Sequence, residues 1–245
     1  MRIIGVIPAR YASTRFPGKP LVDISGKPMI WWVHRQLSLV PGIDEVYIAL
    51  DDERVATVCD SYGIKYEMTL DTHPTHLDRL AEFCLKVDAD FYININGDEP
   101  LMMPEYVVPL IPKDVDPQSF YVANAMTTIK KPVEVPDTSR IKVVTDMLGY
   151  GMYMARTPIP YPQASSNFDY NKFVGIQCFS RSALEFCSTT PRGRLESIED
   201  IDEYRFLENG KKILFIPVEA ETLSVDTPND LSIVRSKIIE REASA

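Results

Sequence analysis

Three basic residues lie close together in the loop that follows the first apolar segment of the chain. Arg10, Arg15 and Lys19 fall within ten residues of an otherwise acidic sequence. Small and hydroxyl residues, such as Ala9 before Arg10 and Ser13 between the two arginines, leave backbone N–H groups accessible. Arg side chains bind phosphate oxygens in pairs, Lys adds a point charge, and backbone N–H groups can complete an anion site. The loop therefore predicts binding of a polyphosphate, and the alternative is a solvated basic loop.

Two aspartates that are far apart in the sequence are candidates for binding a divalent cation. Asp98 follows an apolar segment and Gly97, which permits a tight turn, so it should lie on the same edge of a sheet as the basic loop. Asp226 lies in the stretch Ser-Val-Asp-Thr-Pro. If the two carboxylates meet near the basic loop, a hard divalent cation between them and a nucleotide phosphate is expected. The alternatives are a turn role for Asp98 and a helix-cap role for Asp226.

The elements that must position these residues alternate between strand-like and helix-like segments in the first half of the chain. This alternation predicts a parallel sheet with helices on both faces, and it places binding residues in loops at the carboxyl ends of the strands. We expect strands over residues 3–7, 45–50, 64–68 and 90–95, and helices over residues 29–39, 52–62 and 78–87.

The second half of the chain alternates less regularly. There the pattern predicts strands over residues 120–129, 141–145, 152–156, 173–179 and 212–218, an extended loop over 157–171, a helix over 197–208 and a terminal helix that begins near Pro228. A helix that stops at Asn209-Gly210 agrees with a glycine stop signal. We therefore expect one domain, residues 1–245, in which residues 120–195 form a smaller antiparallel flap.

Composition narrows the class of protein. The chain has 26 basic and 35 acidic residues and a net charge of −9, which argues against coating nucleic acid or an anionic membrane. No apolar run reaches about 18 residues, and the first apolar segment ends at Pro8, too soon for a signal peptide. We therefore expect a cytoplasmic protein. The four cysteines contain no CxxC pair, and the first loop has neither a Walker sequence nor GxGxxG, which argues against zinc ribbons, P-loop ATPases and nicotinamide-dependent dehydrogenases.

Short sequence blocks follow one another in order along nearly the whole chain. They are PARYASTRFPGKPL (8–21), GKPMI (26–30), DD (51–52), DRLAE (78–82), NINGDEP (94–100), KVVT (142–145), RTPIPY (156–161), LESIE (195–199), LENG (207–210) and VDTP (225–228). Together these blocks resemble the 3-deoxy-manno-octulosonate (Kdo) cytidylyltransferases.

The resemblance implies a Rossmann-like nucleotidyltransferase fold with a central mixed, mainly parallel sheet. It implies transfer of CMP from CTP to the hydroxyl of an acidic sugar, with release of pyrophosphate, for cell-surface polysaccharide synthesis. It also implies Mg²⁺ held by Asp98 and Asp226, charge stabilisation by Arg10, Arg15 and Lys19, and a homodimer formed through the flap. The implied nucleotide contacts are Ala9, Arg10, Ser13, Arg15, Lys19, Thr75, His76, Arg79, Asn96 and Asp98.

The chain departs from the family at both ends of the implied site. The family's usual Ser-Gly-Thr before Asp78-Arg79, where main-chain groups meet the cytosine, reads Thr75-His76-Leu77. The usual Gln two residues before the metal-binding Asp reads Asn96. The usual HxGIYAY strand reads FVGIQCF at residues 173–179, and the usual Glu-Gln pair in the next helix reads Asp202-Glu203.

These departures bear on the acceptor, because a site built to hydrogen-bond hydroxyls rejects analogues strongly. The residues expected to bind the acceptor are Arg156, Phe173, Gln177, Asp202 and Glu203. Arg156 would hold a carboxylate, and Glu203 would pair with a further group such as an amine. This interpretation predicts an acidic sugar as the acceptor, either Kdo or a Kdo-like sugar with a feature that plain Kdo lacks. The alternatives are a different small acceptor or an inactive nucleotide-binding module.

Overall fold

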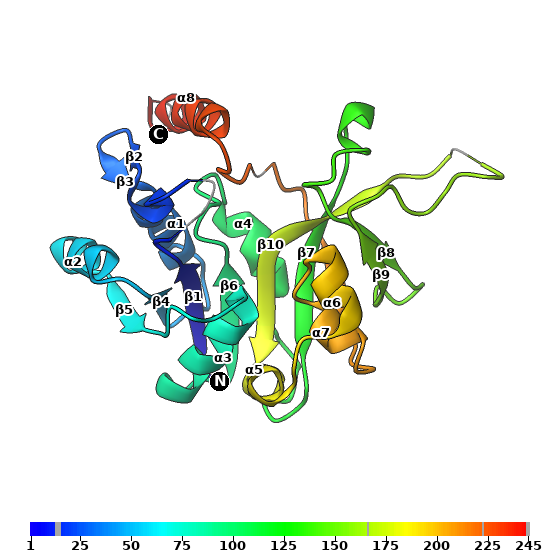
Figure 1. Cartoon of the computed structure of the whole chain (residues 1–245), viewed down its shortest axis with the longest axis horizontal. Coiled ribbons are helices and arrows are strands. Elements are labelled where there is room, and N and C mark those ends of the chain that lie inside the picture. Colours follow the sequence, from blue (N-terminus) through cyan, green and yellow to red (C-terminus); the bar gives the residue numbers. More distant parts are fainter. Residues whose placement is uncertain (13–15, 166, 222, 244–245) are drawn as a thin grey trace.

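A mixed β-sheet forms the centre of the molecule (Figure 1). The computed structural model describes residues 1–12, 16–165, 167–221 and 223–243. In spatial order, the central strands are β11 (Leu214–Pro217), β7 (Val122–Thr128), β10 (Asn171–Ser180), β6 (Phe91–Ile95), β1 (Ile3–Ala9), β4 (Glu45–Leu50) and β5 (Lys65–Met68).

The first half of the chain forms the parallel part of this sheet. β1 pairs in parallel with both β4 and β6, and β4 pairs in parallel with β5. The connecting helices are α1 (Met29–Ser38), α2 (Glu53–Tyr62) and α3 (His76–Lys86). The Thr75 side chain accepts a hydrogen bond from the backbone N–H of Asp78 at 3.2 Å and so caps α3. The helix predicted from residue 78 therefore begins two residues earlier, at His76.

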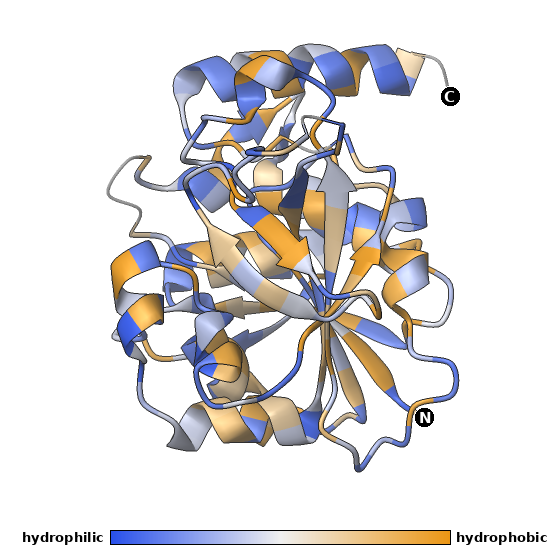
Figure 2. Cartoon of the chain, turned by 90° about the vertical axis from the view of Figure 1, so that its right-hand side faces the viewer, coloured by the Kyte–Doolittle hydropathy of each residue, from blue (hydrophilic) through white to orange (hydrophobic). Residues whose placement is uncertain are grey.

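Helices cover both faces of the sheet because successive side chains of a strand point to opposite sides. Ile3 and Ile7 of β1 belong to a core with α1 and α2, and Ile4 and Val6 belong to a second core with α3. The helix α5 (Arg181–Thr189), which the sequence pattern did not predict, joins the second core. Figure 2 shows hydrophobic residues along the central strands, with α8 (Pro228–Ala243) across one end of the fold. This arrangement confirms the predicted α/β architecture.

The second half of the chain adds antiparallel strands. β10 pairs antiparallel with β6 and β7, while β11 pairs in parallel with β7. Beyond an irregularity between Phe173 and Gln177, β10 extends to β8 (Lys142–Thr145), which pairs with β9 (Gly151–Ala155). Residues 120–195 thus supply strands to the central sheet as well as the β8–β9 arm. Their role as an acceptor-binding and dimerisation subdomain stays a prediction.

The helix predicted over residues 197–208 is wrong as a single element. Two short helices, α6 (Arg194–Glu199) and α7 (Tyr204–Leu207), are separated by Asp200, whose φ of 52° is left-handed. A left-handed residue ends a right-handed helix, and Asp is one of the few residue types that adopts this conformation readily. The break turns the α6–α7 link toward α3.

The remaining elements are short, apart from α8. They are β2 (Asp23–Ile24), β3 (Lys27–Pro28), α4 (Pro104–Val107) and the 3₁₀ turns η1 (Lys19–Leu21), η2 (Val108–Leu110) and η3 (Pro132–Glu134). α8 packs Leu231, Val234 and Ile238 against Ile24 and Trp32. Within the described ranges, no helix has the length and apolar character needed to cross a membrane.

Candidate active site

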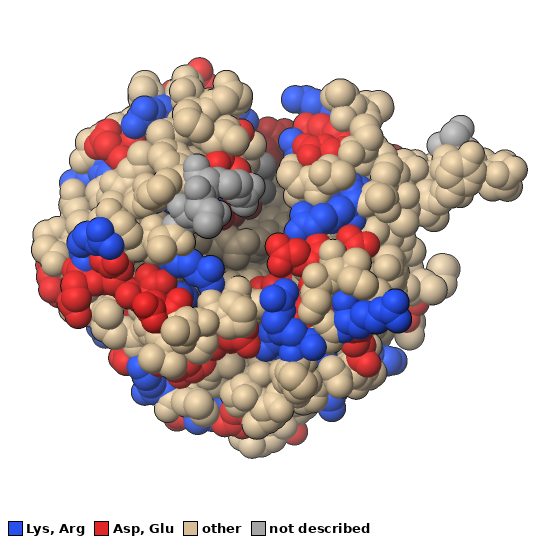
Figure 3. Space-filling view, viewed as in Figure 1, with Lys and Arg blue, Asp and Glu red and all other residues tan. Residues whose placement is uncertain are grey.

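A cavity of about 450 Å³ opens at the carboxyl ends of β1 and β6, where ligands bind in open α/β sheets. Figure 3 shows the hollow between the two halves of the molecule, with basic and acidic side chains near its rim. β1 and β6 are followed at this edge by Ala9-Arg10 and by Asn96-Gly97-Asp98. The other described lining residues are Pro8, Ala12, Lys19, Pro20, Met29, Pro74, Thr75, His76, Arg79, Asp200 and Asp202.

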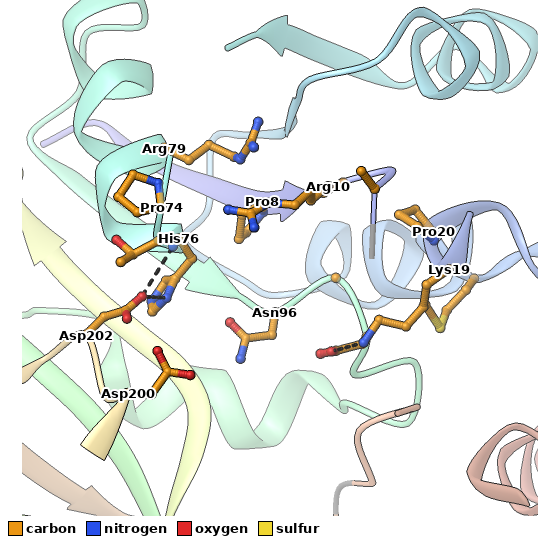
Figure 4. A pocket seen from close by; sticks show the side chains of 16 residues that line it. Pro8, Arg10, Lys19, Pro20, Pro74, His76, Arg79, Asn96, Asp200 and Asp202 are labelled. Carbon is orange, nitrogen blue, oxygen red and sulfur yellow. Dashed lines mark hydrogen bonds and ion pairs between the residues drawn. The ribbon is translucent and has the colours of Figure 1, made fainter. Parts of the chain in front are cut away.

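Lys19 joins the two aspartates that the sequence analysis singled out. Its Nζ lies 2.6 Å from Oδ2 of Asp98 and 3.4 Å from Oδ1 of Asp226. The two carboxylates therefore converge at one point of the cavity edge, as their proposed role requires (Figure 4 draws Lys19 and its partner in the cavity). Asp226 lies directly before Thr227, whose hydroxyl accepts from the backbone N–H of Asp230 at the start of α8. Thr227, not Asp226, caps that helix.

Local backbone contacts bring Asp98 and Asp226 together. A Cβ on Gly97 would lie 2.8 Å from the carbonyl oxygen of Pro8, so the turn into Asp98 passes β1 too closely for any side chain. The backbone N–H of Val225 donates to the carbonyl of Asp98 at 2.9 Å, and the Ser224 hydroxyl donates to Glu99 at 2.6 Å. These bonds fix the segment before α8 beside the end of β6.

The donor set at this point fits a magnesium ion. Carboxylate oxygens are ligands that Mg²⁺ prefers, and Mg²⁺ usually takes one or two carboxylates together with substrate phosphates. Among the described residues, no group of three or more His, Cys, Asp or Glu side chains could hold a metal ion. Asp98 and Asp226 would therefore act with phosphate oxygens, not as a complete protein cage.

The remaining predicted nucleotide residues lie around the same cavity. Arg10 is exposed and donates from Nη2 to the carbonyl of His73 at 2.5 Å. Arg79 is buried, and its guanidinium lies 2.8 Å from Asp51, whose other oxygen accepts from the backbone N–H of Tyr11 at 3.0 Å. Asp51 thus links α3 to the basic loop. Ala9, Thr75 and Asn96 also line the cavity, whereas Ser13 and Arg15 lie outside the described residues.

His76 contacts two of the altered acceptor positions, and a third reaches it through Glu203. Its Nδ1 lies 2.5 Å from Oδ2 of Asp202, and its Nε2 faces Oε1 of Glu203 at 3.6 Å. Gln177 donates to the same Glu203 oxygen at 2.8 Å and accepts a hydrogen bond from Asn94. The departures from the family are therefore in contact with one another, although up to 127 positions separate them in the sequence.

The structure places two of the predicted acceptor residues away from the cavity. Gln177 is fully buried and Glu203 is 2% exposed, so neither side chain faces the cavity. Glu203 could not pair with an amine on the acceptor there, because its carboxylate points to Gln177 and His76. Phe173, partly buried, packs against the core beneath α3 and α5. Of the predicted acceptor residues, only Asp202 belongs to the described lining of the cavity.

Arg156 does not reach the cavity either. Its guanidinium donates to the backbone carbonyls of Glu199 at 2.6 Å, Asp200 at 2.8 Å and Thr138 at 3.1 Å. The first two carbonyls belong to the end of α6, where the last backbone acceptors of a helix lack partners within the helix. Arg156 therefore caps α6 and holds the left-handed turn at Asp200, and the prediction that its fork binds a carboxylate does not agree with this geometry.

Sequence reasoning missed Asp200 as a lining residue. Asp200 reaches the cavity because the left-handed break carries it away from the course of α6. The sequence contains only a weak indication of this role, because Asp200 lies two residues before Asp202 in a segment that otherwise has helical spacing. The carbonyl of Asp200 accepts from Arg156, which directly follows β9 and could not be paired with it from local pattern.

Comparison with known proteins agrees with the predicted fold and family. A family model described as cytidylyltransferase matches residues 4–213. The 3-deoxy-manno-octulosonate cytidylyltransferase of Solibacter usitatus (strain Ellin6076) is 39% identical over 95% of this chain and 93% of its own length. The enzyme of the same name from Escherichia coli is 39% identical over 97% of this chain and 96% of its own length.

Solved structures give the same assignment. The structure of CMP:2-keto-3-deoxy-manno-octonic acid synthetase complexed with CTP has a TM-score of 0.92 and 38% identity, and the match covers 98% of this chain and all of that one. A 4-diphosphocytidyl-2C-methyl-D-erythritol synthase from Anaerococcus prevotii DSM 20548 shares the fold at 14% identity, with a TM-score of 0.64 and 97% and 98% of the two chains covered. This protein therefore belongs to the cytidylyltransferase family, in its 3-deoxy-manno-octulosonate branch.

Proposed function

We propose that this enzyme transfers CMP from CTP to a hydroxyl of Kdo and releases pyrophosphate. The observation that carries the proposal is the convergence of Lys19, Asp98 and Asp226 at the edge of a cavity of sufficient size for a nucleotide. The names of relatives that this chain matches over nearly their full length support Kdo as the acceptor. The product would feed synthesis of a cell-surface polysaccharide.

The chemistry is an attack by the acceptor hydroxyl on the α-phosphorus of CTP. A new P–O bond forms, the bond to the β-phosphate breaks, the hydroxyl proton is released and pyrophosphate leaves. Lys19 and Arg10 bind phosphate oxygens and stabilise the negative charge that grows on them. Asp98 and Asp226 would hold Mg²⁺, which neutralises phosphate charge when it is bound. Asn96, between the two ends of the cavity, is placed to orient the acceptor or the ribose by hydrogen bonds.

The test is release of pyrophosphate from purified protein with CTP, Mg²⁺ and Kdo. We expect turnover that requires all three components, and turnover with CTP well above that with ATP, GTP or UTP. A panel of other acidic sugars, including an amino derivative of Kdo, serves as the comparison. CTP binding without pyrophosphate release from any sugar would instead support an inactive nucleotide-binding module, and release with another sugar alone would support a different acceptor.

We also propose that the enzyme is a cytoplasmic homodimer. Its four cysteines are free and buried, as is usual in a reducing compartment. Met152 and Tyr153 of β9 and Leu148 of the preceding turn are exposed at the outer edge of the arm, at 64%, 38% and 75%. An exposed apolar edge strand is a ready site for pairing with a second copy. Light scattering at micromolar concentration should give twice the mass of one chain, and a monomer mass would contradict the proposal.

A further inference from the structure

The wall of the cavity on the α6–α7 side carries more acidic residues than an anionic substrate should tolerate. Asp200 and Asp202 line it, and the neighbouring Glu203 is buried and faces His76. CTP is a polyanion, and under the proposed function, on which this inference rests, the acceptor also carries a carboxylate. Like charges in close proximity weaken binding, so the charge of this wall needs compensation.

The His76 ring is placed between the two carboxylates. Asp202 Oδ2 accepts from the backbone N–H of His76 at 3.2 Å and lies 2.5 Å from its Nδ1. Nε2 is buried, faces Glu203 at 3.6 Å and has no hydrogen-bond partner among the described residues. Figure 4 shows the ring turned toward Asp202, with dashed lines that join the two residues. An imidazolium in this position has one N–H for each carboxylate.

The charges around the ring keep it protonated. Burial disfavours the charged ring, but Asp202, Glu203 and Asp78 outweigh burial and raise the pKa of His76 to about 9. Burial raises the pKa of Glu203 to about 7, against the attraction of His76. Of the other charged groups nearby, Asp78 is paired with Arg205 of α7, and Asp200 is 81% exposed with Arg192 at 3.6 Å. Gln177 contributes no charge from β10.

We propose that His76 is a specificity-determining residue of the transfer reaction, whose imidazolium offsets one of the two negative charges of Asp202 and Glu203 so that this wall admits an acidic acceptor. The acidic pair is thereby removed as a binding site for an ammonium group. The wall favours a plain acidic sugar such as Kdo over an amino derivative. His76 acts through the charge of the wall and takes no part in the chemical step.

The test compares KM values in variants that alter this charge. His76→Asn keeps a side-chain N–H near the position of Nδ1 but loses the positive charge. At pH 7 we expect the KM for Kdo to rise about tenfold, with kcat within about threefold of wild type and a smaller rise in the KM for CTP, because residues 75–77 are expected to meet the cytosine through main-chain groups. In His76→Asn/Asp202→Asn the KM for Kdo should return to within about threefold of wild type. His34→Asn, which alters a histidine of α1 outside the cavity, is the matched control and should behave as wild type.

The pH profile separates a charge effect from a merely structural one. In wild type the KM for Kdo should rise between pH 7 and pH 10, as Glu203 ionises and His76 loses its proton. His76→Asn should show a weaker rise over that range because only Glu203 still titrates. Asp202→Asn keeps His76, so its result does not depend on whether a substitution at position 76 disturbs the fold. This variant should lower the KM for Kdo or leave it unchanged. An unchanged KM in His76→Asn, an equal rise in the KM for CTP, or no rescue in the double variant would overturn the inference.

An NMR titration decides the charge state without turnover. The chain has three histidines, so the His76 ring signals are assigned by their loss in His76→Asn. In wild type they should stay those of an imidazolium at pH 7.5, and in Asp202→Asn they should titrate at lower pH. A neutral His76 ring in wild type at pH 7.5 would overturn the inference. Absence of pyrophosphate release with Kdo, despite a charged ring, would contradict the proposed function alone.

Discussion

Asp98→Asn should lower kcat for pyrophosphate release by about a thousandfold, equivalent to about 4 kcal/mol of transition-state stabilisation. The amide keeps the size of the side chain and one oxygen but removes the negative charge that a divalent cation requires. It also removes half of the charge that holds Lys19, whose Nζ lies 2.6 Å from this carboxylate. Asp226→Asn should show a loss in the same direction, because Asp226 holds the other side of the same point at 3.4 Å from Lys19.

The loss should come from the chemistry and not from the fold. The side chains of Asp98 and Asp226 are 24% and 30% exposed, so solvent screens their pairing with Lys19 and the free energy of unfolding should change by less than about 1 kcal/mol. Asp114→Asn, at an exposed position away from the cavity, is the matched control. Steady-state kinetics over a Mg²⁺ titration measure the loss of kcat, and a melting curve for each variant measures any change in stability. Turnover within tenfold of wild type at saturating Mg²⁺ would rule out the ligand assignment.

Arg205→Met should lower the free energy of unfolding by about 3–5 kcal/mol, the usual cost of leaving buried charges without their partner. Arg205 is 1% exposed and donates to Glu196 at 2.6 and 3.1 Å, and it also bonds Asp78 in the first turn of α3. Glu196 is itself fully buried. Met fills similar volume but leaves both carboxylates without the guanidinium, although Arg192 still reaches Glu196 at 3.1 Å.

The pH dependence of this deficit has a defined sign. Burial acts to raise the pKa of Asp78, but the hydrogen bonds from Arg205 and Thr75 outweigh it and leave the pKa below its usual value. The stability that this carboxylate contributes is therefore complete above about pH 4 and is lost as pH falls through the lowered pKa. The difference between wild type and Arg205→Met should narrow in acid.

Urea unfolding at pH 7 and at about pH 2.5 measures both effects, because the contribution of Asp78 is lost only below about pH 4. Arg194→Met, which changes an exposed arginine of α6, should stay within about 0.5 kcal/mol of wild type. Glu196→Gln in the Arg205→Met background should recover part of the loss by removing one unpaired buried charge. A change below about 1 kcal/mol in Arg205→Met would show that the cluster does not stabilise the fold.

Local pattern was enough to predict the parallel half of the fold. The apolar run that forms β1 is buried on both faces. The helices α1 and α2 are encoded by the helical spacing of their own apolar residues and by the residues at their ends, all of which lie close together in the sequence. The same is true of the phosphate end of the site. Lys19 follows Gly18, whose φ is 69°, and Asp98 follows Gly97, so both turns are encoded next to the residues that they position.

Local pattern failed where a partner comes from another part of the chain. The break at Asp200 depends on Arg156, which directly follows β9. Arg156 donates to the carbonyls at the end of α6. The sequence could not show that Arg156 had backbone partners in place of a substrate carboxylate. It could not show either that Glu203 points to Gln177 on β10 and His76 on α3.

The sequence alone determined the family and the α/β class, and it singled out the basic loop and the candidate metal ligands Asp98 and Asp226. Each of these inferences rests on residues that are close together or on blocks that occur in a characteristic order. The tertiary structure decided which of the altered residues face the cavity and which neutralise one another. A side chain's residue type is local information, but its direction, burial and charge state depend on groups that the fold brings to it. For that reason the residue types of Asp202 and Glu203 indicated an amine site, whereas in the structure both carboxylates face His76, which lowers the negative charge they present.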